Sequence, residues 1–148
     1  MMKEIEIGKI PEVERVLIED FGIIRRADIK FSPGLNLIIG RAASGKTTVI
    51  KYLIGRSYPI AMAAGERVMW DIDLELNKSC LLIDGILGRL DKEKLVKTLK
   101  KLETCKRQII ATMCLQQLDF IKHRIKANII NTKDFDLKIE EENERTNN

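Results

Sequence analysis

The stretch that decides the fold is LNLIIGRAASGKTTVIKYLIG, residues 35–55. Residues 35–39 are nearly all apolar, as expected for a parallel strand that is covered on both faces. Residues 49–55, VIKYLIG, resemble a helix, and a loop with small and hydroxyl-bearing side chains lies in between. A strand that enters such a loop and continues as a helix is the context in which main-chain N–H groups bind phosphate. We therefore expect a phosphate site between residues 40 and 48.

The loop matches the pattern G-x-x-x-x-G-K-[ST] of nucleotide-binding phosphate loops. Its glycines would let the backbone wrap around the phosphates, and the start of the following helix would add the positive end of its dipole. Lys46 is expected to reach the β- and γ-phosphates, and the Thr47 hydroxyl to bind Mg²⁺. A chance match in a turn rich in glycine and alanine is the alternative, which the flanking strand and helix disfavour. The expected ATP-binding residues are Gly40, Arg41, Ala42, Ala43, Ser44, Gly45, Lys46, Thr47 and Thr48.

A second oxygen ligand for the metal is expected at the end of another apolar strand. Residues 79–83, SCLLI, end at Asp84, which is followed by Gly85. A strand-end aspartate beside a phosphate loop completes a magnesium site in many such proteins, so we expect Asp84 to bind the metal with Thr47, and Lys46 and Asp84 to be the catalytic residues. The alternative for Asp84 is the capping of a turn.

The remaining pattern predicts an α/β fold. Short strands alternate with amphipathic segments, which favours a mainly parallel sheet flanked by helices. Short turns separate the earliest strands, which predicts a small antiparallel N-terminal flap beside that sheet. We expect one domain over residues 1–139 and a solvated tail over 140–148. The expected strands are 13–19, 27–31, 35–39, 79–83, 108–112, ANIIN (127–131) and FDLKI (135–139); the expected helices follow Thr48, begin at Ala63 and Asp91, and cover 113–127, with a connector at 56–60.

Composition excludes several classes of protein. The chain has 148 residues, of which 45% are hydrophobic and 32% charged, as in a globular domain. No apolar run is long enough to span a membrane, and the acidic residues near the start of the sequence lead us to expect no signal peptide there. The three cysteines are widely spaced and the histidine is single, so reduced, packed thiols in a cytoplasmic protein are favoured over a zinc site.

With these motifs in place, the chain resembles the ABC-type ATPases, in particular the SMC, RecF and RecN branch. The resemblance covers most of residues 14–131 and rests on the order of several motifs. VLIEDFG and IKFSPGLNLIIGRAASGKTT resemble the opening strands and phosphate loop of that branch. AAGER (63–67) resembles a worn signature motif, GRLD (88–91) lies in the place of the D-loop, and QIIATM (108–113) resembles the strand that leads to the switch histidine.

The resemblance implies a head-to-tail dimer with ATP and Mg²⁺ between the phosphate loop of one subunit and the signature helix of the other. Small residues at Ala63–Gly65 would let the partner's phosphates approach, and Phe21 lies where the wider family stacks an aromatic ring on adenine. The alternatives stay open: AAGER could simply begin a helix, Asp91 could cap one, and Phe21 could be a core residue in a turn.

The departures from the family pattern all concern the γ-phosphate. Gly85 occupies the position of the acid that activates water, Met113 with Cys114 after it replaces the switch histidine, and Ala63 lacks the signature hydroxyl. The segment after Thr48 is too short for a lid or a coiled-coil insertion. General-base catalysis contributes about 10²–10⁴-fold, so we expect slow hydrolysis or none in the isolated chain.

Two other functions remain as alternatives to this nucleotide-dependent switch. One is a small P-loop kinase or phosphotransferase, which would need a basic lid near residues 113–127. The other is a non-catalytic ATP-binding subunit that acts through a partner ATPase chain. The net charge of +4 permits DNA as a partner, although basic helix faces are usually only solvated surface. Those faces carry Lys92, Lys94, Lys97, Lys100, Lys101, Lys122, Arg124 and Lys126.

Overall fold

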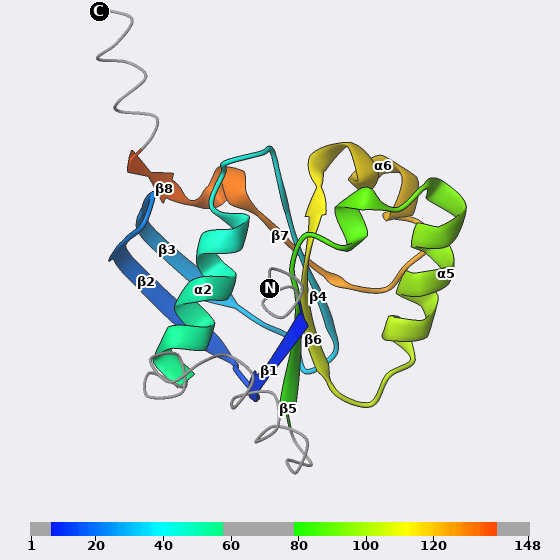
Figure 1. Ribbon diagram of the computed structural model, residues 1–148, viewed down its shortest axis with the longest axis horizontal. Coiled ribbons are helices and arrows are strands. Elements are labelled where there is room, and N and C mark those ends of the chain that lie inside the picture. Colours follow the sequence, from blue (N-terminus) through cyan, green and yellow to red (C-terminus); the bar gives the residue numbers. More distant parts are fainter. Residues whose placement is uncertain (1–6, 58–78, 139–148) are drawn as a thin grey trace, which may run out of the picture.

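The computed structural model describes residues 7–57 and 79–138 (Figure 1). Its larger sheet has five strands in the order β1-β5-β6-β4-β7. The four strands from β5 to β7 are parallel, and β1 pairs with the edge of β5 in the antiparallel sense. The bounds are β1 (Ile7–Pro11), β4 (Leu35–Gly40), β5 (Ser79–Ile83), β6 (Gln108–Cys114) and β7 (Asn128–Asn131). The predicted α/β fold with a mainly parallel sheet is confirmed.

The smaller sheet is antiparallel, has three strands and forms the predicted flap. It has the order β2-β3-β8, with β2 (Arg15–Phe21), β3 (Ile24–Lys30) and β8 (Asp136–Leu137). Strand β8, near the C-terminal end of the described chain, joins β3, so the flap contains strands from distant parts of the sequence.

Helices cover the two faces of the larger sheet (Figure 1). Helix α2 (Lys46–Ser57) lies on the side of the flap, and α5 (Lys92–Glu103) and α6 (Leu118–Ile121) lie on the other side. Single turns of 3-10 helix, η1 (Leu87–Arg89), η2 (Leu115–Gln117) and η3 (Thr132–Asp134), follow strands β5, β6 and β7. None of the described helices has the length and apolar character needed to cross a membrane.

Strand β4 separates two hydrophobic cores because alternate side chains of a strand point to opposite faces. Ile38 joins the core between the sheet, α2 and the flap. Leu37 and Ile39 join the core beneath α5 and α6. This alternation explains why the segment before the phosphate loop is almost wholly apolar, and every residue of β4 is buried.

Two buried amides connect the sheets near the start of β4. Asn36 is fully buried, and its Nδ2 donates to the main-chain oxygens of Ser32, Gly34 and Ile109. Gln108 accepts from Val13 N at 2.8 Å and donates to the oxygens of Val13 and Ser32. These bonds connect the main chain of the turns before β2 and before β4 to the buried side chains of β4 and β6.

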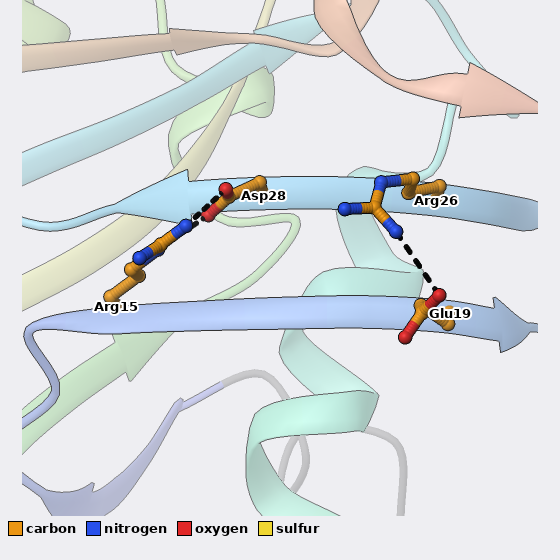
Figure 2. Close-up of polar contacts among 4 residues, drawn as sticks. All are labelled: Arg15, Glu19, Arg26 and Asp28. Carbon is orange, nitrogen blue, oxygen red and sulfur yellow. Dashed lines mark hydrogen bonds and ion pairs between the residues drawn. The ribbon is translucent and has the colours of Figure 1, made fainter.

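The outer face of the flap carries a row of ion pairs (Figure 2). Arg15 of β2 makes paired contacts with Asp28 of β3, with 2.8 Å between Nε and Oδ1. Arg26 bonds Glu19 at 3.1 Å between Nη1 and Oε2. The Arg15 hydrogen bond is the main cause that lowers the pKa of Asp28 below its ordinary value, and it also raises the pKa of Arg15.

Some predicted elements were wrong. Strand β1 was not predicted, because glycine and proline interrupt its short apolar pattern in IGKIP and only pairing with β5 makes it a strand. The helix predicted over 113–127 is instead the end of β6, the turn η2 and the short α6. Its apolar residues still face the core, since successive 3-10 and α turns place Leu115, Leu118, Ile121 and Ile125 against α5.

Other predictions fall partly or wholly outside the described residues. The predicted FDLKI strand is reduced to Asp136–Leu137, and α2 extends to Ser57, two residues into the predicted connector. The rest of that connector, the helix expected from Ala63 with its signature residues, and the tail at 140–148 lie outside the described ranges. The single-domain boundary at residue 139 stays a prediction.

Candidate nucleotide-binding site

The loop between β4 and α2 lies at the carboxyl edge of the parallel strands, where ligands bind in open α/β sheets. Its two glycines are needed for different reasons. A Cβ atom on Gly40 would lie 2.0 Å from Thr132 Oγ1 and 2.5 Å from Ser44 Oγ, so this position has no room for a side chain. Gly45 has space, but its φ of 103° is a conformation that only glycine adopts at low cost.

The backbone of the loop has the alternation that forms anion-binding concavities. Ala43 has a φ of 58° and Gly45 one of 103°, with Ser44 between them. Residues of alternating hand turn successive N–H groups toward one centre. This alternation is typical of anion-binding loops. Arg41, Ala42 and Ala43 are exposed, Ser44 is half-buried, and Gly45 is buried.

Lys46, the first residue of α2, is half-buried and points back over the loop. Its ammonium donates to Gly40 O at 2.9 Å and to Met113 O at 3.1 Å. Both acceptors are neutral main-chain oxygens at the ends of β4 and β6, so no carboxylate neutralises the charge among these contacts. A phosphate group at this position would offer Lys46 a stronger, charged acceptor.

Asp84 lies next to Thr47, although β5, which ends before Asp84, and β4, which leads to the loop before Thr47, are not neighbours in the sheet. Strand β6 lies between β4 and β5, yet Thr47 Oγ1 approaches Asp84 Oδ1 at 3.2 Å. The buried Thr112 of β6 fills the space between them, and its hydroxyl donates to the same Oδ1 at 2.8 Å. Thr112 is a site residue that the sequence analysis missed. A hydroxyl near the end of the strand QIIATMC, directly after the apolar residues IIA, was the available signal.

The oxygens of Thr47 and Asp84 fit magnesium rather than a softer metal. Mg²⁺ prefers oxygen ligands and is usually held by one or two carboxylates together with substrate phosphates and water. Among the described residues no group of three or more His, Cys, Asp or Glu side chains is placed to hold a metal ion. The donor set is therefore that of a site completed by a phosphate-bearing ligand.

Gly85 and Met113, which depart from the family pattern, are both held in defined surroundings. Gly85 has a φ of 83° and its N–H donates to Thr112 Oγ1 at 3.1 Å. Met113 is 1% exposed and its side chain packs in the core beneath α5 and α6, on the face of the sheet opposite to α2. Neither position directs a side chain toward Lys46.

The flap contacts the start of α2 through its β2–β3 turn. Gly22 has a φ of 56°, and a Cβ there would lie 2.9 Å from Thr48 Cγ2. Next to it, Phe21 is 38% exposed and makes an edge-to-face contact with Tyr52, with ring centroids 5.1 Å apart. The alternative of a core phenylalanine is therefore wrong, and the stacking of Phe21 on adenine stays a prediction.

A hollow of about 370 Å³ adjoins the first half of the loop. Arg41 and Ser44 line it from the loop, and Thr132 and Lys133 from η3. Thr132 is buried and donates to Ser44 Oγ at 2.9 Å, and Ser44 donates in turn to Arg41 O at 2.6 Å. These bonds fix the loop against the end of β7, a support that the sequence did not reveal.

Other predicted residues have different surroundings. Asp91 caps α5 by accepting from Lys94 N at 2.8 Å, which is the alternative left open above, and its D-loop role stays a prediction. All three cysteines are free; Cys80 is buried, Cys114 is half-buried and Cys105 is exposed, so the expectation of packed thiols is wrong for Cys105.

Part of the chain is similar in sequence to known proteins. A family profile described as "AAA domain" matches residues 15–54. Over 45 residues the chain is 47% identical to the DNA replication and repair protein RecF of Aliivibrio fischeri, a stretch that is 29% of this chain and 12% of that protein. RecF of Proteus mirabilis is 29% identical over 83 residues (55% and 22%), and RecF of Streptococcus thermophilus is 31% identical over 78 residues (52% and 20%).

These matches cover only 12% to 22% of the length of the three relatives. No solved structure matches the chain. The profile match spans β2, β3, β4 and the phosphate loop, and together with the RecF similarity it supports an ATP-binding P-loop module similar to that of the RecF branch.

Proposed function

We propose that this chain is an ATP-binding switch module that resembles a minimal ABC/SMC-type ATPase head, binds ATP with Mg²⁺ and hydrolyses it slowly or not at all alone. The observation that carries the proposal is the meeting of Lys46, Thr47 and Asp84 beside a loop in the phosphate-binding conformation. Each of the three provides a charge or an oxygen that a magnesium–triphosphate complex needs.

Slow hydrolysis is supported by the lack of a suitable side chain at the two positions where a general base would lie. Gly85 has no side chain, and Met113 is a core residue. The carboxylate of Asp84 accepts from Thr47 and Thr112 at Oδ1, and in this proposal its other oxygen binds magnesium rather than activating water. A water molecule would therefore lack a positioned group to accept its proton, and the chain would keep ATP bound rather than cleave it.

The phosphotransferase alternative has less support. A lid would need basic side chains that are available to transferred phosphate. Lys122 forms an ion pair with Asp119 at 3.2 Å, and Arg124 lies 4.4 Å from the centre of the Phe120 ring while donating to Phe120 O. These side chains bond within α6 and its flank, on the side of the sheet away from α2. DNA binding by the basic helix faces stays a prediction.

The test of the proposal is ATP binding by the parent chain and by Lys46→Ala. Fluorescent ATP is titrated with each protein at millimolar Mg²⁺. We expect saturable binding by the parent and a loss of at least about tenfold in the variant, because a charge-assisted contact to phosphate contributes about 1.5–3 kcal/mol. Steady ATP turnover is measured on the same samples.

The matched control is Lys51→Ala, which removes an exposed lysine of the same helix away from the loop. It should bind ATP as the parent does. Equal, weak uptake by the parent and by Lys46→Ala would refute the binding function. Turnover by the parent in the usual enzymatic range of about 1–10³ per second would refute the proposal that the isolated chain hydrolyses ATP slowly or not at all.

A further inference from the structure

Thr112 has an unusual environment for a polar residue in the central strand of a sheet. It is 3% exposed, in a strand whose other residues from Gln108 to Met113 are also buried. Strand β6 lies between the strand of the phosphate loop and the strand of Asp84. Side-chain alternation places Thr112 on the face of α2, with Ile110, while Met113 faces α5. The hydroxyl therefore points into the gap between Asp84 and Thr47.

Both hydrogen-bonding functions of this hydroxyl are used within the site. It donates to Asp84 Oδ1 at 2.8 Å and accepts from Gly85 N at 3.1 Å. One atom thus fixes the carboxylate and the main chain that follows it. The branched Cβ of threonine restricts χ1, so the hydroxyl keeps this direction without a large loss of rotamer freedom.

We propose that Thr112 is the positioning residue for Asp84: it holds the carboxylate toward the metal position and locks Gly85 in its left-handed conformation. This inference rests on the proposed ATP and Mg²⁺ function. Both hydroxyl contacts go to Oδ1, and among the described residues no hydrogen bond occupies Oδ2. The oriented carboxylate therefore keeps one oxygen for magnesium.

The same bond explains why position 85 is a glycine. The N–H of Gly85 is held by Thr112 while its φ is 83°. A residue with a Cβ is strained at such an angle. Thr112, which orients Asp84, therefore also holds position 85 in a conformation that disfavours a side chain. Position 85 is where the family pattern has the acid that activates water, so the same threonine accounts for the oriented metal ligand and for the missing acid.

The experiment is a magnesium titration of fluorescent-ATP binding in Thr112→Val, Thr112→Ala and Thr112→Ser. Partners that orient metal ligands typically contribute 10–100-fold in metal affinity. We expect the hydroxyl-free variants to need about tenfold more Mg²⁺ for half-maximal binding, and Thr112→Ser to return close to the parent value. Binding of the nucleotide in EDTA should change by less than about twofold, because the phosphate loop and Lys46 are untouched.

The control is Thr98→Val, the same change in the half-buried Thr98 of α5, on the far side of the sheet, which should titrate like the parent. Urea unfolding shows which variants fold. An unchanged magnesium dependence in a folded hydroxyl-free variant overturns the inference alone, as does a serine variant as weak as the valine variant. If only Thr112→Ser folds, the role is structural and the inference also fails. A parent chain that does not bind ATP refutes the proposed function first.

Discussion

At the scale of single residues, the glycines show that one residue type can be required for unlike reasons. Gly40 is needed because Thr132 and Ser44 leave no space for a Cβ. Gly45 and Gly85 are needed because their φ angles of 103° and 83° are left-handed. The phosphate-loop pattern identifies Gly40 and Gly45, but it does not say whether space or backbone conformation requires glycine at each.

Position 85 yields a direct prediction. Gly85→Glu should not convert the chain into an active ATPase. A non-glycine residue at this φ costs about 1–3 kcal/mol, and the hydrogen bond to Thr112 keeps the backbone from turning the new carboxylate toward the phosphate site. We expect a lower free energy of unfolding in urea and a single-turnover ATP cleavage rate close to that of the parent.

The companion variant Gly85→Ala separates the two effects. It should show the loss of stability without adding a carboxylate. A cleavage rate raised about 10²–10⁴-fold in Gly85→Glu, the range of a working general base, would show that the backbone does not prevent an acid from acting there.

At the scale of the elements, the β2–β3 pair carries its stability in cross-strand contacts as well as in its apolar inner face. The inner residues Ile18, Ala27 and Ile29 are buried in the core shared with α2. On the outer face, Arg15 and Glu19 of β2 contact the oppositely charged Asp28 and Arg26 of β3 (Figure 2). Opposite charges in cross-strand contact favour this register over a slipped one.

The Arg15–Asp28 pair predicts a small acid-dependent loss of stability. The pKa of Asp28 is lowered in the folded chain, so its contribution is present above its unfolded pKa, about 3.9, and is lost as the pH falls through the folded value. We expect Asp28→Asn to be less stable than the parent at pH 7 in urea unfolding, and the difference to shrink as the pH falls below about 4. The pair is exposed, so the effect is modest and decreases with salt.

A double-mutant cycle with Arg15→Gln is the control. In that background Asp28→Asn should no longer alter the acid dependence. A stability difference between parent and Asp28→Asn that stays constant from pH 7 to pH 3 would contradict the assignment of the shift to Arg15.

At the scale of the whole molecule, the proposed switch implies a change in assembly. If the chain acts as an ATPase head, Mg-ATP should convert a monomer into a dimer, because the phosphates bound at Lys46 would also contact the partner subunit. Sizing by light scattering with and without Mg-ATP measures this. Lys46→Ala should stay monomeric under both conditions.

The alternative outcomes of that measurement identify the rival functions. A monomer with bound ATP that becomes active only on mixing with a partner ATPase chain would favour the regulatory subunit. Transfer of phosphate to an added acceptor would favour the phosphotransferase. Either result would contradict the homodimeric switch.

The sequence by itself determined the local parts of this protein. The phosphate loop, its flanking strand and helix, the strand-end Asp84 and the apolar strands follow from neighbouring residues, because periodicity and turn chemistry act over short distances along the chain. The same local rules wrongly predicted one helix over 113–127. There a 3-10 turn and the short α6 bring Leu118, Ile121 and Ile125 into the core without a continuous helix.

Only the tertiary structure decided which of these parts meet. Strand β1 exists because β5 offers an edge, and β8 joins the flap from the other end of the chain. Thr112 reaches Asp84 because β6 lies between β5 and β4, and Met113 is turned into the opposite core by the same strand. The order of strands in a sheet depends on contacts between residues far apart in the chain, and no local pattern carries that information.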